Sequence, residues 1–198
     1  AVLAKLGSAP VSEQSSGVND KDLAAQISSV IRSGANGVVE NCFPTITALL
    51  MKQTKQLGGT YTIMGGAGPA SPSVLNILTD DEADGVYSAS TGVPQAIDRE
   101  RVRSWITAYQ AKWKEDPDAY SANGYDSVYI VRRAVEQAGS LETEAIHEAI
   151  AATKGYPGIN YPITFDQYGD GVHAVVLTRN TGKRPEVIDY IWEEGFEP

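Results

Sequence analysis

The sequence predicts an α/β fold in which a doubly wound parallel sheet carries helices in three layers. In the first half of the chain, short apolar segments alternate with helices that have one apolar face. The connections between them are short, as parallel sheets with crossover helices require. Two of the expected strands also end in loops of small residues, and ligands of such sheets bind at the carboxyl ends of the strands.

The first half contains six elements after a short polar strand candidate at Pro10–Ser15. The first helix has Leu23, Ile27, Val30 and Ile31 on one face, with Asn19 as its expected cap. The spacing predicts helices over 20–33, 44–57 and 73–78, and strands over 37–42, 61–64 and 86–89.

The second half is mainly helical until its last fifty residues. A break at Asp116-Pro117-Asp118 separates the first two helices, and Gly139 ends the second. The pattern predicts helices over 98–114, 123–137 and 143–153, strands over 162–165 and 174–178, and a last strand or extended tail over 187–192.

Composition narrows the classes of function. The 198 residues are 42% apolar and carry a formal net charge of −9, which disfavours nucleic acid or an anionic membrane as a partner. The sequence contains no run of about 18 apolar residues, so it predicts no membrane-spanning helix. One cysteine, Cys42, excludes an internal disulfide and a zinc site built from cysteines.

The chain starts with a pattern typical of a helix end. Residues 1–6 look like the last turns of a helix, and Gly7 is its expected stop. We therefore expect the chain to be a piece of a longer protein.

Several motifs imitate catalytic or metal sites without completing them. The glycine loop at 65–68 lacks the lysine of a phosphate loop, and the run at 166–171 has Tyr168 where a calcium ligand belongs, which favours a hairpin turn. His147 has no second histidine four residues later, and the acidic run at 81–84 predicts a solvated helix end. We expect Cys42 to be a small buried side chain rather than a nucleophile. The sequence thus predicts no enzyme, no metal and no cofactor.

Two further patterns favour ordinary packing. Trp105, Tyr109 and Trp113 recur every fourth residue, which is typical of a packed helix face. The charged segment 98–103 predicts a solvated helix start.

Several stretches together resemble the type I periplasmic solute-binding proteins, the branched-chain amino acid and amide receptors of ABC importers. The similarity covers essentially the whole chain and rests on the order and spacing of its motifs rather than on one of them. The stretches are Asp22–Val39, Gly65–Gly68, Leu78–Val86, Tyr109–Lys112, Asp116-Pro117, Gly124–Val128, Ala134–Gly139 and Gly158–Asp170.

The resemblance implies two α/β lobes joined by three hinge strands, with the ligand in the cleft. Residues 1–92 and 172–198 correspond to most of the C-terminal lobe, and residues 93–171 to the late part of the N-terminal lobe. The start of the full protein, including the opening strand of the C-terminal lobe, is missing from this pattern. The chain alone should therefore bind ligand poorly.

The resemblance also implies the ligand-binding residues. They lie in the loop Cys42, Phe43 and Pro44 and in the glycine loop at Gly66, Ala67 and Gly68, with Tyr125 added from the other lobe. Amino acid binders of this family place an acidic residue in the glycine loop, where this chain has Ala67.

The implied function is non-catalytic transport. The expected protein is an extracytoplasmic component of an ABC importer, periplasmic or anchored to the membrane as a lipoprotein, that binds a small polar solute by hinge closure and docks on a permease. The alternative is a ligand-sensing domain of a receptor or transcription regulator with the same fold. An interrupted sheet should also leave a strand edge and apolar helix faces uncovered, which predicts self-association by edge pairing or by swapping.

Overall fold

A computed structural model of the protein describes residue 5 and residues 7–192. The expected helix end at residues 1–6 lies mostly outside them. The described chain divides into two compact units. Unit 1 comprises residues 1–88 and 179–186, and unit 2 comprises 89–178 and 187–198, so the chain passes from one unit to the other three times. The assignment of segments to the two lobes of the resembled family stays a prediction.

Unit 1 alternates strands and helices in the expected order. Its elements are β1 (Gly37–Val39), β2 (Thr62–Gly65) and β3 (Tyr87–Ser90), with α2 (Ala24–Ser33), α3 (Pro44–Gln56), η1 (Gly68–Ala70), α4 (Pro72–Leu75) and α5 (Asp80–Ala83) between and before them. β1 pairs with β2 and β2 with β3, both in parallel. The parallel α/β prediction is confirmed for these strands.

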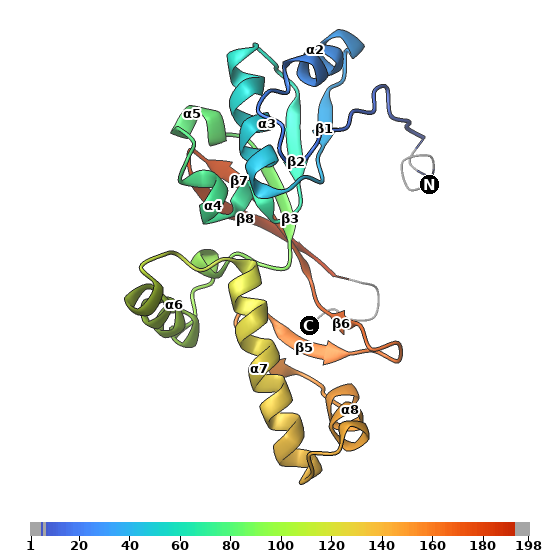
Figure 1. Ribbon diagram of the computed structural model, residues 1–198, viewed down its shortest axis with the longest axis vertical. Helices are drawn as coiled ribbons and strands as arrows, with labels where there is room; N and C mark the ends of the chain where they lie inside the picture. The colour runs from blue at the N-terminus through green and yellow to red at the C-terminus, as the bar shows by residue number, and fades with distance from the viewer. Residues whose placement is uncertain (1–4, 6, 193–198) are drawn as a thin grey trace. The chain divides into compact units, whose positions relative to one another are not determined.

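The sheet also includes two late strands. β7 (Val175–Thr181) and β8 (Arg184–Ile191) complete a five-stranded sheet in the order β1-β2-β3-β7-β8. Figure 1 shows β1 and β2 side by side. Because β1 stands at the end of the order, its outer edge has no partner strand among the described residues.

The core of unit 1 lies between α3, α4 and the sheet. Met51 of α3, Ile63 of β2 and Val74 of α4 are 5% exposed or less and belong to one apolar cluster. Burial of a side chain of this size stabilises the fold by about 1.5–3 kcal/mol. At β1 the helices cover one face, because Val38 packs against this cluster whereas Val39 is 82% exposed.

Unit 2 is built mainly from three helices. They are α6 (Glu100–Trp113), α7 (Ala119–Ala138) and α8 (Thr143–Ala151), preceded by η2 (Pro94–Ala96). A small antiparallel sheet follows, in the order β4 (Tyr156–Pro157), β5 (Pro162–Phe165) and β6 (Gly171–Val172). The expected hairpin turn is confirmed, because Phe165 pairs with Gly171 across it.

Two boundaries differ from the prediction because of contacts that the sequence spacing does not reveal. α2 starts at Ala24 rather than residue 20, since the Gln53 side chain of α3 accepts the Leu23 amide at 2.7 Å. α7 starts four residues earlier than expected, since Asp118 and Ser121 form a reciprocal capping box.

The polar strand expected at Pro10–Ser15 is wrong, since this segment forms no strand. The aromatic spacing on α6 gives packing at Trp105 and Tyr109, whereas Trp113 is 56% exposed. The start of α6 is solvated as expected, because the charged side chains of 98–103 are exposed. Arg99 also donates to the Ile159 and Asn160 carbonyls at 2.5 and 3.1 Å.

Candidate functional site

The candidate site lies at the carboxyl ends of β1 and β2. β1 ends at Val39 and continues into the loop 40–43, which leads into α3. β2 ends at Gly65 and continues into the glycine loop at 66–68. Because Val39 and Met64 are paired in a parallel register, the two loops leave the sheet at the same edge.

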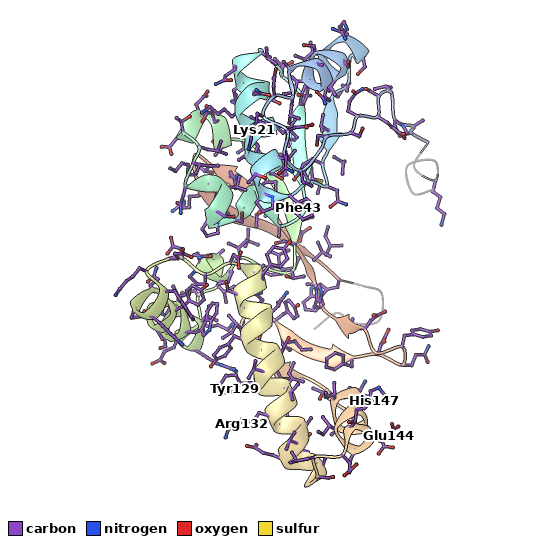
Figure 2. The ribbon with its side chains drawn as sticks, viewed as in Figure 1. Lys21, Phe43, Tyr129, Arg132, Glu144 and His147 are labelled. Carbon is purple, nitrogen blue, oxygen red and sulfur yellow. The ribbon has the colours of Figure 1, made fainter. Side chains whose placement is uncertain are left out.

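Phe43 is the most prominent side chain of the first loop. It is 66% exposed and stands at the N-terminal end of α3, as Figure 2 shows. Its backbone is extended, and its carbonyl accepts the Ile46 and Thr47 amides at 2.9 Å. Pro44 then occupies the first turn, where its missing N–H costs no hydrogen bond. The local sequence therefore fixes the backbone here and leaves the aromatic ring free to contact a solute.

Cys42 differs from the sequence expectation. Its thiol is free and the residue is exposed, so the prediction of a small buried side chain is wrong. The pKa of this thiol is raised by desolvation and further by the negative charge of Glu40. A raised pKa keeps the thiol protonated near neutral pH and disfavours a nucleophilic role.

Glu40 is a residue of the first loop that the sequence reasoning missed. It is 7% exposed, and its Oε2 accepts the Cys42 amide at 2.8 Å and the Thr47 hydroxyl at 3.1 Å. A buried carboxylate that accepts two hydrogen bonds is satisfied within the loop it stabilises. The signal in the sequence was an acidic residue directly after an apolar strand.

The second loop is shaped by its lack of side chains. A Cβ added at Gly66 would meet no atom within 4 Å, so this backbone borders open space. The Gly66 carbonyl accepts a hydrogen bond from the buried Ser88 hydroxyl of β3. Ala67 carries no polar group, and Gly68 begins η1. This loop offers a solute backbone groups and no charged side chain.

Asn180 of β7 supports the segment after the glycine loop. This side chain is fully buried, and its amide donates to the Pro69 carbonyl at 3.0 Å. Its Oδ1 is buried and has no partner among the described residues. The loop is thus held in place from a strand more than a hundred residues later in the sequence.

Tyr125, the predicted contribution from the other lobe, lies on α7 in unit 2. Its ring packs against Trp105 and Tyr129, with centroids 5.8 and 4.6 Å apart. The pKa of its hydroxyl is raised, mainly by a hydrogen bond with Tyr129 and then by burial. Tyr125 therefore belongs to an aromatic cluster of unit 2, and its role in ligand binding stays a prediction.

Unit 2 contains a buried polar group that sequence reasoning missed. Asp126 is 2% exposed, and its Oδ2 accepts the Ile159 amide at 2.7 Å. Its Oδ1 has no partner among the described residues. Burial raises the pKa of this carboxyl, although the Ile159 hydrogen bond and the charges of Arg101 and Arg99 oppose the shift.

The described residues bring together no group of three or more histidine, cysteine, aspartate or glutamate side chains that could hold a metal. Within residues 5 and 7–192, no helix has both the length and the apolar composition that a membrane crossing needs.

Comparison with known proteins gives one consistent result. A family model described as "Periplasmic binding protein" matches residues 1–184. A leucine-, isoleucine-, valine-, threonine- and alanine-binding protein of Pseudomonas aeruginosa is 28% identical over 153 residues, which are 76% of this chain and 39% of that protein.

Solved structures agree with this match. A leucine-binding protein of Thermotoga maritima has a TM-score of 0.77 and 27% identity, over 89% of this chain and 50% of that one. A solute-binding protein of an ABC transporter from R. palustris, solved with benzoate, has a TM-score of 0.69 at 13% identity, over 89% and 49% of the two chains. This last likeness shows the fold alone.

The chain spans about half the length, or less, of these relatives. The family model nevertheless covers nearly all of it, and the fold agrees with the solved structures. The chain therefore belongs to the periplasmic binding protein family.

Proposed function

We propose that this chain is part of an extracytoplasmic solute-binding component of an ABC importer. The observation that carries the proposal is the family match over residues 1–184, which includes both strand-end loops of the candidate site. The whole protein binds a small polar solute between two lobes, and closure about the hinge creates the form that a permease recognises. No catalytic step is part of this function.

The proposed ligand class is an amino acid, an amide or a small carboxylate-like solute. The relative from P. aeruginosa is named for binding leucine, isoleucine, valine, threonine and alanine, and the one from T. maritima for binding leucine. In this chain the glycine loop has Ala67, so it supplies no carboxylate to an ammonium group. Phe43 supplies an exposed aromatic surface and Gly66 an open backbone.

Calorimetry with a defined panel tests this function. The panel contains leucine, isoleucine, valine, threonine and alanine, their amides, and benzoate, each titrated into the whole protein and into this chain. We expect binding to the whole protein and little or none to the chain alone, because the family pattern places part of the ligand contacts outside this chain. Equal affinity of the two proteins would contradict the two-lobed site, and no binding of any panel member to the whole protein would contradict the ligand class.

A substitution connects that binding to the candidate loops. Phe43→Ala should weaken binding by the whole protein about tenfold or more, since it removes one large contact surface at the ligand. Tyr168→Phe is the control, because Tyr168 is 80% exposed on the turn between β5 and β6 in unit 2. Unchanged affinity of the Phe43 variant would remove this loop from the site.

The proposed location is the periplasm, with a lipoprotein anchor as the alternative form of the same function. Cell fractionation separates the two, since a free protein is released by osmotic shock whereas a lipid-anchored protein requires detergent. Recovery of the whole protein in the cytosol would contradict both. Co-purification of the whole protein with a permease, enhanced by solute, tests the proposed partner.

We also propose that this chain associates with a second copy of itself through the outer edge of β1. The edge has no partner strand among the described residues, and Val39 beside it is 82% exposed. Sedimentation velocity should show a concentration-dependent dimer that Val39→Lys reduces, because charged residues discourage edge pairing. A monomer at all concentrations would contradict this proposal.

A further inference from the structure

Glu40 is joined to both loops of the candidate site. Its Oε2 accepts the Cys42 amide in the first loop and the hydroxyl of Thr47, one turn into α3. Its carboxyl group also lies directly over Gly65, where the second loop begins. A Cβ at Gly65 would overlap Glu40 Oε1 and would stand 2.8 Å from Glu40 Cδ.

Thr47 makes a second connection of the same kind. It is fully buried, and its Oγ1 lies 3.1 Å from the position that a Cβ would take at Gly68. The hydroxyl that donates to Glu40 is therefore packed against the glycine loop as well. Gly65 and Gly68 leave the space that Glu40 and Thr47 occupy.

We propose that Glu40 is a positioning residue that holds the Cys42–Pro44 loop at a fixed place beside the glycine loop. The inference rests on the proposed function insofar as these loops form the ligand site. Glu40 acts through the loop backbone, and the residues that contact solute are its neighbours.

The hydrogen-bonding chemistry explains why a glutamate stands here. Hydrogen bonds to an ionised carboxylate are about twice as strong as those between neutral groups. Both hydrogen bonds fall on Oε2, so the single oxygen of a glutamine at position 40 can accept them, but each bond is weaker without the negative charge. Glu40→Gln therefore loosens the loop while the core of unit 1 stays filled.

Cys42 provides a reporter for the loop that needs no ligand. It is the one cysteine among the 198 residues, and it is exposed. Its alkylation by iodoacetamide, followed against pH, gives two separate quantities. The midpoint reports the pKa of the thiol, which Glu40 raises and Ser16 lowers. The rate at the high-pH plateau reports how accessible the thiol is and how freely the loop moves.

For Glu40→Gln we expect both quantities to change. Loss of the negative charge of Glu40 lowers the midpoint, which raises the alkylation rate at pH 8. The plateau should rise about threefold, although a thiolate of lower pKa is intrinsically less nucleophilic. A lower midpoint with an unchanged plateau would make Glu40 a neighbouring charge without a positioning role, and no change in either would also overturn the proposal.

A size exchange tests the contact with the glycine loop. Gly65→Ala should raise the plateau because its Cβ displaces the Glu40 carboxyl group, and adding this substitution to Glu40→Ala should change the plateau little. In the Glu40→Ala background the new Cβ at position 65 would still stand 2.8 Å from Pro69 Cγ. The thermal unfolding midpoint is therefore measured for the wild type, the two single variants and the double variant. Equal effects of Gly65→Ala in both backgrounds would contradict the contact.

The solute panel connects the positioning role to function. Glu40→Gln in the whole protein should weaken binding about tenfold with the fold intact, whereas Glu136→Gln, a surface variant of α7, should change neither binding nor Cys42 alkylation. Full affinity of Glu40→Gln would overturn the positioning role. If the wild-type protein binds no panel solute, the proposed function fails, and the two alkylation quantities still decide the role of Glu40.

Discussion

The two units each bury a carboxylate, and they satisfy it differently. In unit 1, Glu40 accepts the Cys42 amide and the Thr47 hydroxyl and lies at the edge of the sheet that holds the candidate loops. In unit 2, Asp126 of α7 accepts one backbone amide and leaves Oδ1 without a partner among the described residues. In each unit one carboxylate oxygen accepts the hydrogen bonds, two at Glu40 Oε2 and one at Asp126 Oδ2.

The difference shows what each carboxylate can do. Glu40 has one donor in the loop and one on α3, so its charge connects the loop backbone to the helix. Asp126 is enclosed by α7 and the segment 157–161, and burial there favours its protonated form. A buried carboxylate that accepts hydrogen bonds from two donors, as Glu40 does, can hold a loop in place. One that has a single donor, as Asp126 has, makes the stability of the fold depend on pH.

The largest expected effect comes from deleting the better-satisfied carboxylate. Glu40→Ala leaves a backbone amide and a buried hydroxyl without an acceptor, which should lower the free energy of unfolding by about 2–4 kcal/mol. Chemical denaturation of the chain measures this, with Glu136→Ala on the surface of α7 as the control. If Glu40→Ala lowers the free energy of unfolding no more than Glu136→Ala does, the hydrogen bonds of Glu40 do not stabilise the fold.

A smaller, pH-dependent effect should separate Asp126 from Glu40. Because the folded-state pKa of Asp126 is raised, its contribution is fully present below the unfolded pKa and is lost as pH rises through the folded pKa. The wild-type protein should therefore lose stability relative to Asp126→Asn as pH increases from about 3.9 upward. Denaturation of both proteins at several pH values measures the difference.

A difference between these two proteins that stays constant with pH would contradict the raised pKa. Glu136→Gln serves as the matched control for a carboxylate exchanged for its amide on the same helix. It should leave the pH profile of the wild-type chain unchanged.

The sequence allowed the order of elements in unit 1 to be predicted, because apolar spacing within ten residues carries that information. Segments 37–42, 44–57 and 61–64 correspond to β1, α3 and β2 with differences of a few residues. The loops at 42–44 and 66–68 were predicted for a related reason, since they follow apolar strands. Whether these residues contact a ligand stays a prediction.

The polar interior could not be predicted, because it depends on contacts between distant residues. Glu40 after two valines looks like the polar end of a strand until Thr47 and Gly65 are placed against it. Cys42 was expected to be buried because it is small and apolar, and it is exposed because Glu40 and not Cys42 enters the interior. Arg99 bonds to carbonyls sixty residues away, which no local pattern indicates.

The smallest expected effect concerns Tyr161, whose hydroxyl is buried near Asp126. Burial, followed by the Asp126 charge, raises the pKa of Tyr161 to about 12, and its ring stacks on His173 at 4.4 Å. The neutral phenol is favoured in the fold, so this contribution to stability is lost as pH rises from about 10 through 12. Tyr161→Phe should change the free energy of unfolding at neutral pH by about 1 kcal/mol or less, because it removes a hydroxyl and keeps the ring that stacks on His173. It should also remove the latest component of the absorbance titration of tyrosinate, whereas Tyr168→Phe should leave that component in place. If the latest component remains in Tyr161→Phe, another tyrosine titrates last, which would contradict the raised pKa of Tyr161.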